Sequence, residues 1–245
     1  MKQIIRTSVF AALIALSAAL GGCFTSGSVA VKGDGNMTAG SLAYEGPITK
    51  IDLSKVGATL NITSEKSGEI TYSIDGNLKP LLDIKVNGGV LTITSNNGKM
   101  LLGNSAAFNI GTDALREITA DSEVKIVGNG TFKADTFRMA INGAAAVNLA
   151  LDAGSVSVNV NGAGDIDLSG AADKLDIQNN GASAVKARGL VAQDVSATIN
   201  GVGSVEVYAA KTLDAAVNGV GSVTYWGDPQ LSHSASGLAS VKKGG

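Results

Sequence analysis

Apolar and polar residues alternate along the C-terminal half of the chain, and the alternation repeats at a nearly constant interval. The dipeptide Asn-Gly recurs at spacings of 19, 19, 20 and 18 residues. It divides the chain into five segments, 136–154, 155–173, 174–193, 194–211 and 212–229. When these are aligned, the second, fourth, sixth, twelfth and fourteenth positions hold 24 apolar residues in 25 places, and the interleaved positions hold 7 in 25. A period of two predicts β-strands with one buried face, because a helix needs apolar residues every three to four positions.

The apolar positions keep the same parity on both sides of Asn-Gly, so we expect the chain to bend there and continue to face one core. Asn-Gly is also a common two-residue hairpin turn, and five hairpins in succession would form an antiparallel meander instead. We favour the first interpretation, a parallel β-solenoid in which each segment is one turn, or rung, of about 19 residues. Successive rungs would rise by about 4.8 Å.

The asparagines of the Asn-Gly corners would then lie above one another in a column. Their amides can hydrogen-bond from rung to rung, and asparagine tolerates the left-handed backbone that a bend can require. We interpret this column as structural support and not as a ligand site. Its members are Asn142, Asn161, Asn180, Asn200 and Asn218.

The regular rungs, 136–229, are followed by a degraded copy of the pattern at residues 230–245. Ser236 takes the place of the corner asparagine, and His233 enters an inward position. A polar terminal rung protects the edge of a solenoid from aggregation. We therefore assign His233, the sole histidine, to a cap and not to catalysis.

Upstream of residue 136 the repeat is blurred. Residues 115–135 fit an irregular rung, and shorter strands bounded by Gly, Asn and Lys-Pro are expected before it. Whether these strands form early rungs or a separate small sheet stays open. They are expected at 48–52, 58–63, 69–74, 81–86, 90–94 and 108–110.

The N-terminus has the features of a lipoprotein leader at residues 1–22. A positively charged start is followed by an apolar run, 9–20, that is too short to span a membrane. The run ends in Leu-Gly-Gly-Cys, which resembles the bacterial lipobox, so we expect lipidation of Cys23. Residues 23–42, rich in Gly and Ser, are predicted to be a flexible tether, and residues 43–245 the folded domain.

The leader places the protein in the bacterial cell envelope. Phe24 follows the cysteine where an inner-membrane lipoprotein often has Asp, so the outer membrane is favoured over the inner one. The membrane, reached through the lipid on Cys23, is the expected partner.

Composition excludes several classes of function. The formal net charge is −2, so the basic surface of a nucleic-acid-binding protein is not expected. One Cys and one His exclude a disulfide framework and multi-His or Cys-rich metal sites. No phosphate-binding, dinucleotide-binding or zinc-protease motif is present. We therefore expect no metal, no cofactor and no catalytic residue.

One pair of outward carboxylates keeps an enzymatic alternative open. Asp165 and Asp167 lie on the same strand face, about 6.6 Å apart by strand rise. Glycosidases use two carboxyl groups at comparable separations. The spacing is generic and has no aromatic subsite around it, so a carbohydrate-active lyase or hydrolase remains the alternative.

The fifteenth position of the repeat collects three large side chains on a surface otherwise built from small residues. They are Arg188, Tyr208 and Trp226, and Trp226 is the only tryptophan. Arginine and aromatic residues dominate binding hot spots, so these residues are candidates for binding a glycan or an envelope protein. The alternative is a cation–π ladder that shields the C-terminal rungs.

The Gly-rich corners at 199–203 and 217–221, each Ile/Val-Asn-Gly-Val-Gly, and the close at 223–229 carry a resemblance to a known family. Over roughly residues 44–243 the chain resembles the putative auto-transporter adhesin, head GIN domain family of bacterial envelopes. The resemblance implies an all-β, right-handed single-stranded parallel β-helix in an exported, often lipid-anchored protein without an established activity. A non-catalytic protein for adhesion or partner binding is expected, and a purely structural envelope spacer is a further alternative.

Overall fold

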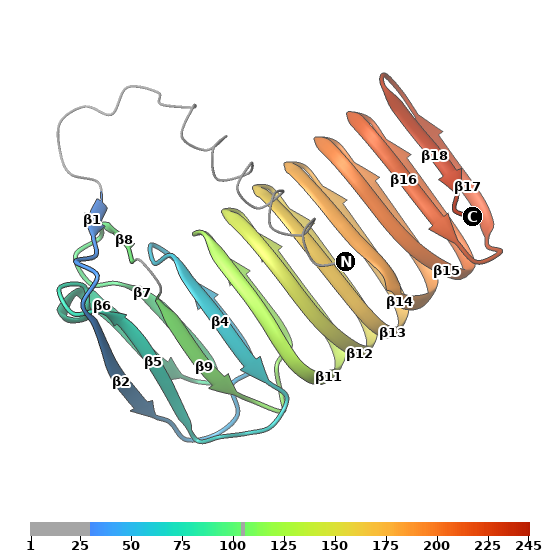
Figure 1. The fold of residues 1–245 in the computed structure, drawn as a ribbon. Coiled ribbons are helices and arrows are strands. Elements are labelled where there is room, and N and C mark those ends of the chain that lie inside the picture. The colour runs from blue at the N-terminus through green and yellow to red at the C-terminus, as the bar shows by residue number, and fades with distance from the viewer. Residues whose placement is uncertain (1–29, 104–105) are drawn as a thin grey trace, which may run out of the picture.

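The structure is a computed structural model that describes residues 30–103 and 106–245. These residues form an all-β solenoid of stacked parallel rungs, with about 7 turns about 19 residues apart (Figure 1). The predicted β-solenoid is therefore confirmed. The hairpin alternative is wrong, because successive segments pair in parallel, with Val147 beside Ile166 and Ile166 beside Val185.

The predicted leader at 1–22, the lipidation site Cys23 and residues 24–29 of the predicted tether lie outside the described residues. In the described part of the chain, no helix has the length and apolar character needed to cross a membrane.

The long strands of the solenoid are β11 (Val124–Ile141), β12 (Ala144–Val160), β13 (Ala163–Asn179), β14 (Ala182–Ile199), β15 (Val202–Val217) and β16 (Val220–Trp226). Strands β12 to β15 each run from one Asn-Gly corner to the next, β11 ends at the first of these corners, and β16 begins after the last. Residues 230–243 add a last rung, because β17 (Gln230–Ala235) pairs in parallel with β15 and β18 (Ala239–Lys243) pairs in parallel with β16.

The N-terminal strands are β1 (Ala30–Lys32), β2 (Met37–Ala43), β3 (Lys50–Leu53), β4 (Ala58–Thr63), β5 (Glu69–Asp75), β6 (Leu82–Asn87), β7 (Val90–Ser95), β8 (Met100–Leu102), β9 (Ala107–Gly111) and β10 (Glu117–Ala120), with one short 3₁₀ helix, Lys79–Leu81. Of these strands, β3 to β7, β9 and β10 lie close to where the sequence predicts them, whereas β1, β2 and β8 are not among the predicted strands.

These strands form both early rungs and a cap. Strands β3 and β4 pair in parallel with β10 and β11, so residues 48–63 form the rung beneath 115–135. Strands β7 and β9 pair with β3 and β4 and form the next rung down. Along the chain, residues 48–63 form one rung, residues 90–111 form the rung beneath it, and residues 115–135 form the rung above it. Strands β6 and β5 pair antiparallel with β7 and β9, and β2 pairs antiparallel with β5, which closes this end.

The interpretation of residues 23–42 as a tether is wrong from residue 30 onward. Strand β1 pairs with β8, and β2 pairs along its whole length with β5. Gly40 contributes to this packing, because a Cβ there would overlap the ring of Tyr72. Glycine at this position therefore allows close contact with a neighbouring strand. The abundance of glycine alone predicts a flexible segment, which is the reason that a tether is expected here.

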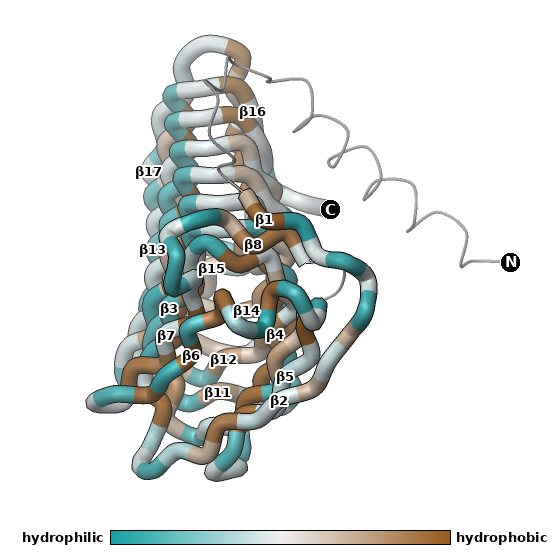
Figure 2. Tube along the Cα trace, turned by 90° about the vertical axis from the view of Figure 1, so that its left-hand side faces the viewer, coloured by the Kyte–Doolittle hydropathy of each residue, from teal (hydrophilic) through white to brown (hydrophobic). Residues whose placement is uncertain are grey.

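The core is a set of aliphatic columns that run along the inside of the stack. In the twelfth position of the repeat, Val147 is 3% exposed and the four residues stacked above it are fully buried. One polar residue, Asn179, takes an inward position among these aliphatic columns and is fully buried. Its Oδ1 accepts from the backbone N–H of Gly181 at 3.2 Å, and its Nδ2 donates to the carbonyl of Ser183 at 3.3 Å. Figure 2 shows hydrophilic segments recurring one above another along an edge of the stack.

The corner glycines are required by close stacking of the rungs. A Cβ on Gly181 or Gly201 would overlap the carbonyl oxygen of the glycine in the rung beneath. The expectation of a left-handed backbone at the corner asparagines is wrong, because Lys55 is the one described non-glycine residue with positive φ. The advantage of asparagine at the corners therefore lies in its side chain, which forms a hydrogen bond to the neighbouring rung.

Candidate functional site

The corner asparagines form a continuous, directional ladder of hydrogen bonds. The Nδ2 of each donates to the Oδ1 of the asparagine in the preceding rung, at 2.8, 3.0, 2.9 and 2.9 Å from Asn161 to Asn218. At the base, Asn142 donates to Asp121 at 2.6 Å. Asp121, which sequence reasoning missed, occupies the corner of the irregular rung 115–135. The amides are occupied by one another, as expected of structural support.

The three large residues of the fifteenth position lie near one another but not in a single register column. Tyr208 pairs with Trp226 as expected, whereas its partner on the other side is Val191 and not Arg188. The expectation of a stacked column is wrong at Arg188, because the pairing of β14 with β15 shifts between Ala187 and Val191. Arg188 therefore lies in an irregular, exposed part of its strand.

Trp226 is engaged by residues of this chain. The guanidinium carbon of Arg188 lies 4.2 Å from the centroid of its ring. The indole Nε1 donates to the carbonyl of Gly245 at 3.3 Å, and Gly244 packs so closely on the ring that a Cβ there would overlap it. This arrangement matches the cation–π alternative, in which the aromatic residue shields the C-terminal rungs.

The carboxylates considered for catalysis lie on an outer strand face of β13, and both are exposed. Asp165 is held by Lys186, whose Nζ lies 2.8 and 3.0 Å from its two carboxylate oxygens. Neither Asp165 nor Asp167 lines the groove that runs over the corners opposite to Asn-Gly.

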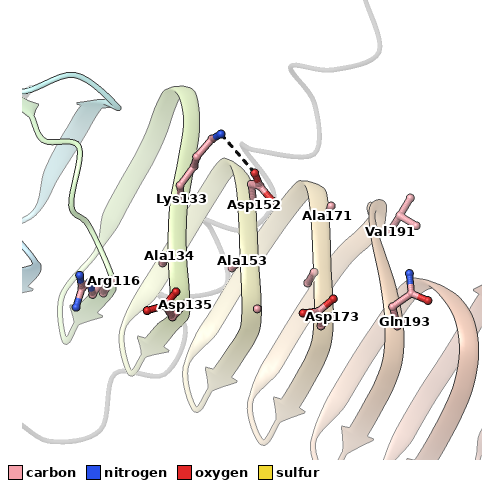
Figure 3. A pocket seen from close by; sticks show the side chains of 12 residues that line it. Arg116, Lys133, Ala134, Asp135, Asp152, Ala153, Ala171, Asp173, Val191 and Gln193 are labelled. Carbon is pink, nitrogen blue, oxygen red and sulfur yellow. Dashed lines mark ion pairs between the residues drawn. The ribbon is translucent and has the colours of Figure 1, made fainter.

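A groove of about 580 Å³ runs over the corners opposite to Asn-Gly, from Arg116, just before β10, across β11, β12 and β13 to β14 (Figure 3). Its middle row consists of Ala134, Ala153 and Ala172, which occupy the same register position in successive rungs. Polar side chains flank this row on both sides. The remaining lining residues are Arg116, Lys133, Asp135, Asp152, Gly154, Ala171, Asp173, Val191 and Gln193.

The groove carries both signs of charge, with an acidic excess. Lys133 lies 3.7 Å from Asp152 on one rim, where both side chains are largely exposed. On the other rim (Figure 3), Asp135 and Asp173 have no hydrogen-bond or ion-pair partner among residues 30–103 and 106–245. In the same residues, no group of three His, Cys, Asp or Glu side chains could hold a metal ion.

Sequence reasoning missed the groove because the repeat loses its alignment after the fourteenth position. The corners Asp152-Ala153-Gly154 and Ala171-Ala172-Asp173 share small residues and aspartate. Their relative placement becomes clear only from the register, in which Ala153 pairs with Ala172.

Comparison with known proteins places the chain in a family. The model of the family described as putative auto-transporter adhesin, head GIN domain, matches residues 48–229. The chain belongs to this family. The match includes the early rungs, the groove and the Asn ladder, so the head GIN domain of this chain comprises most of the solenoid. Among curated proteins, no match was found.

Solved structures share the fold of this head GIN domain. A putative adhesin from Bacteroides fragilis is 23% identical with a TM-score of 0.80, covering 87% of this chain and 99% of its own. A putative adhesin from Parabacteroides distasonis is 22% identical with a TM-score of 0.67, covering 87% and 99%. A protein of the same organism described as a putative lipid binding protein is 20% identical with a TM-score of 0.63, covering 88% and 100%. At these identities the likeness is one of fold.

Proposed function

We propose that this protein is a lipid-anchored protein of the bacterial cell envelope that acts by adhesion or ligand binding and catalyses no reaction. Membership of the head GIN domain family, whose description is that of an adhesin, carries this proposal. The solved neighbours from Bacteroides fragilis and Parabacteroides distasonis, also described as putative adhesins, support it.

The rigid architecture is suited to presenting a surface. Each rung is hydrogen-bonded to both of its neighbours, so the outer faces form one continuous sheet surface. Stacked rungs transmit stability through neighbour contacts and provide extended binding surfaces. The groove lies on this rigid scaffold, which limits the entropy lost when a partner binds.

The anchor would orient the solenoid. Cys23 precedes the first described strand, which begins at Ala30, by seven residues. Seven residues span at most about 25 Å when fully extended. Lipid on Cys23 would therefore hold the capped N-terminal end near the membrane. We propose the outer membrane as the location, because Phe24 follows the cysteine.

The test compares the full chain with its Cys23→Ser variant in a Gram-negative host. We expect incorporation of radiolabelled palmitate and recovery in the outer-membrane fraction for the unchanged protein, and neither for Cys23→Ser. A second measurement is adherence of the expressing cells to a glycan-coated surface, which should exceed that of cells carrying the empty vector. Equal labelling of both proteins would refute the anchor. Adherence no greater than in the vector control would refute the adhesive role.

Enzymatic action is tested with the same purified chain. We expect no release of reducing ends or unsaturated uronates from polysaccharides over a day of incubation. Activity that disappears in Asp165→Asn and Asp167→Asn would establish the carbohydrate-active alternative and overturn the non-catalytic proposal.

A further inference from the structure

We infer that the groove over β11 to β14 is a binding site for a linear glycan without acidic groups. This inference rests on the proposed binding function and specifies its ligand class. It concerns a surface distinct from Trp226, whose ring and N–H are engaged within the chain.

The shape of the groove suits an extended chain molecule. The alanine row runs perpendicular to the strands and advances one rung at a time, through Ala134, Ala153 and Ala172. With about 4.8 Å per rung, the four rungs from β11 to β14 extend over about 14 Å. The polar rims therefore repeat at a distance close to the length of one sugar ring. A linear oligosaccharide lying along the solenoid axis would meet equivalent surroundings at each rung.

Over β12 and β13, the backbone of the groove is not free for recognition of a peptide by strand addition. Such recognition requires free N–H and C=O groups at a sheet edge. Here β12 and β13 each pair with a neighbouring strand on both sides, so their backbone groups bond between rungs, whereas residues 131–136 of β11 pair with β12 alone. A ligand over β12 and β13 must therefore be held through side chains and by contact with the alanine row. Sugar hydroxyl groups and the apolar faces of sugar rings suit this combination.

The lining of the groove holds three acidic and two basic side chains, and its two acidic residues without a partner among the described residues disfavour acidic ligands. Asp135 and Asp173 lie on the same rim, two rungs and thus about 10 Å apart. In the described part of the chain neither has a partner, so each carboxylate can accept hydrogen bonds from hydroxyl or amino groups. Gln193, on the next rung, adds donors and an acceptor. A uronic acid or a nucleic acid would place like charges against both carboxylates, which is unfavourable.

The C-terminal end of the groove adds apolar contact. Val191 lies on the rim opposite Gln193 and is 42% exposed (Figure 3). It protrudes where β14 is longer than β15, at the same irregularity that displaces Arg188. A ring stacked beside Val191 would bury part of this apolar surface.

The experiment measures glycan binding by the full chain, purified in detergent, with isothermal titration calorimetry. The probes are linear β-linked tetrasaccharides of glucose, N-acetylglucosamine and glucosamine, with the tetrasaccharide of galacturonic acid as the acidic contrast. The groove variants are Asp135→Asn with Asp173→Asn, and Ala171→Lys, which places a long, non-aromatic side chain on the exposed rim. Asp167→Asn is the matched control, because Asp167 is equally exposed on β13 but lies outside the groove.

We expect at least one non-acidic probe to bind, and both groove variants to weaken this binding by about tenfold or more, equivalent to about 1.4 kcal/mol. Asp167→Asn should bind as the unchanged protein does, and the acidic probe should not bind. Circular dichroism of each variant establishes that it is folded.

The inference is overturned if no non-acidic probe binds at millimolar concentration, if both folded groove variants bind as well as the unchanged protein, or if the acidic probe binds better. If cells expressing the groove variants adhere as well as cells expressing the unchanged protein, the proposed function is retained and the groove is refuted as its site. Loss of adherence in Cys23→Ser, with unchanged glycan binding by the purified protein, would separate anchoring from recognition.

Discussion

The side-chain amide of Asn142 donates a hydrogen bond of 2.6 Å to the carboxylate of Asp121. Every amide above it in the ladder donates in the same direction, toward the N-terminal end of the stack. The Asn ladder therefore begins on an anion, and its first hydrogen bond is charge-assisted, whereas the others join neutral amides. Asp121 thus connects the irregular rung to the regular ones.

Replacing Asp121 with Ala should lower the free energy of unfolding by about 1 kcal/mol, because the acceptor for Asn142 is lost at an exposed site. Urea denaturation followed by circular dichroism measures the change. Asp214→Ala, an exposed carboxylate on β15 outside the ladder, serves as the control and should change stability by less than about 0.5 kcal/mol. Equal losses in the two variants would contradict a specific role for Asp121.

Ser183→Ala should raise the free energy of unfolding by about 1 kcal/mol. The hydroxyl oxygen of Ser183 is buried and has no hydrogen-bond partner in the described residues, so the folded state bears its desolvation cost. Alanine fits this inward position, which is held by Ala145 in another rung. Thermal and urea unfolding of this variant are compared with those of Ser196→Ala, an outward serine of the same strand, which should be neutral. A loss of stability in Ser183→Ala would show that the hydroxyl makes a favourable interaction.

Arg188→Ala should expose the indole of Trp226 to solvent and lower the free energy of unfolding by about 0.5–1 kcal/mol, because the cation–π contact is lost. Trp226 is the only tryptophan, so tryptophan emission, excited selectively over that of the four tyrosines, reports on this site alone. We expect a red-shifted emission and stronger quenching by acrylamide. Arg188→Lys keeps the charge, so its emission and quenching should lie between those of the unchanged protein and Arg188→Ala. Unchanged quenching in the alanine variant would show that Arg188 does not cover the ring in solution.

The contribution of Lys50 to stability should depend on pH. Its ammonium lies 3.0 Å from Glu117 and 3.4 Å from Asp52. The hydrogen bond to Glu117 raises the pKa of Lys50 above its usual value, with further support from the charges of Asp52 and Glu117, although burial opposes the shift. A group whose pKa is raised in the folded state stabilises the protein. Its full contribution is present below the pKa of the unfolded chain, about 10.4, and is lost as the pH rises through the pKa of the folded state.

Lys50→Met should therefore lower the free energy of unfolding by at most about 1 kcal/mol at pH 8, because the pair is partly exposed. The difference from the unchanged protein should shrink above about pH 10. Urea unfolding at pH 8 and pH 11 measures both differences, with Lys125→Met on the exposed face of β11 as the control. A difference that stays constant over this range would contradict the role of the ammonium charge.

Much of the solenoid could be predicted from periodicity, because the cause is local. An inward position recurs at every second residue, and a solenoid offers one common interior, so columns such as Val147 and Ile166 follow directly from the alternation. The N-terminal arrangement could not be predicted in this way. Nothing in the local pattern of residues 90–111 indicates that they lie beneath residues 48–63, since this order depends on which edges remain unpaired when the chain returns at Glu117.

The sequence by itself determined the strands, the inward columns and the recurring Asn-Gly corners, because alternation and rung spacing leave few other ways to bury the apolar side chains and to stack the backbone so closely. Tertiary structure decided what depends on register between rungs: the anionic base of the ladder at Asp121, the displacement of Arg188 from beneath Tyr208, and the groove beside Ala153. Bulges change this register by one to a few residues, and their effect on neighbouring rungs is a property of the stack as a whole.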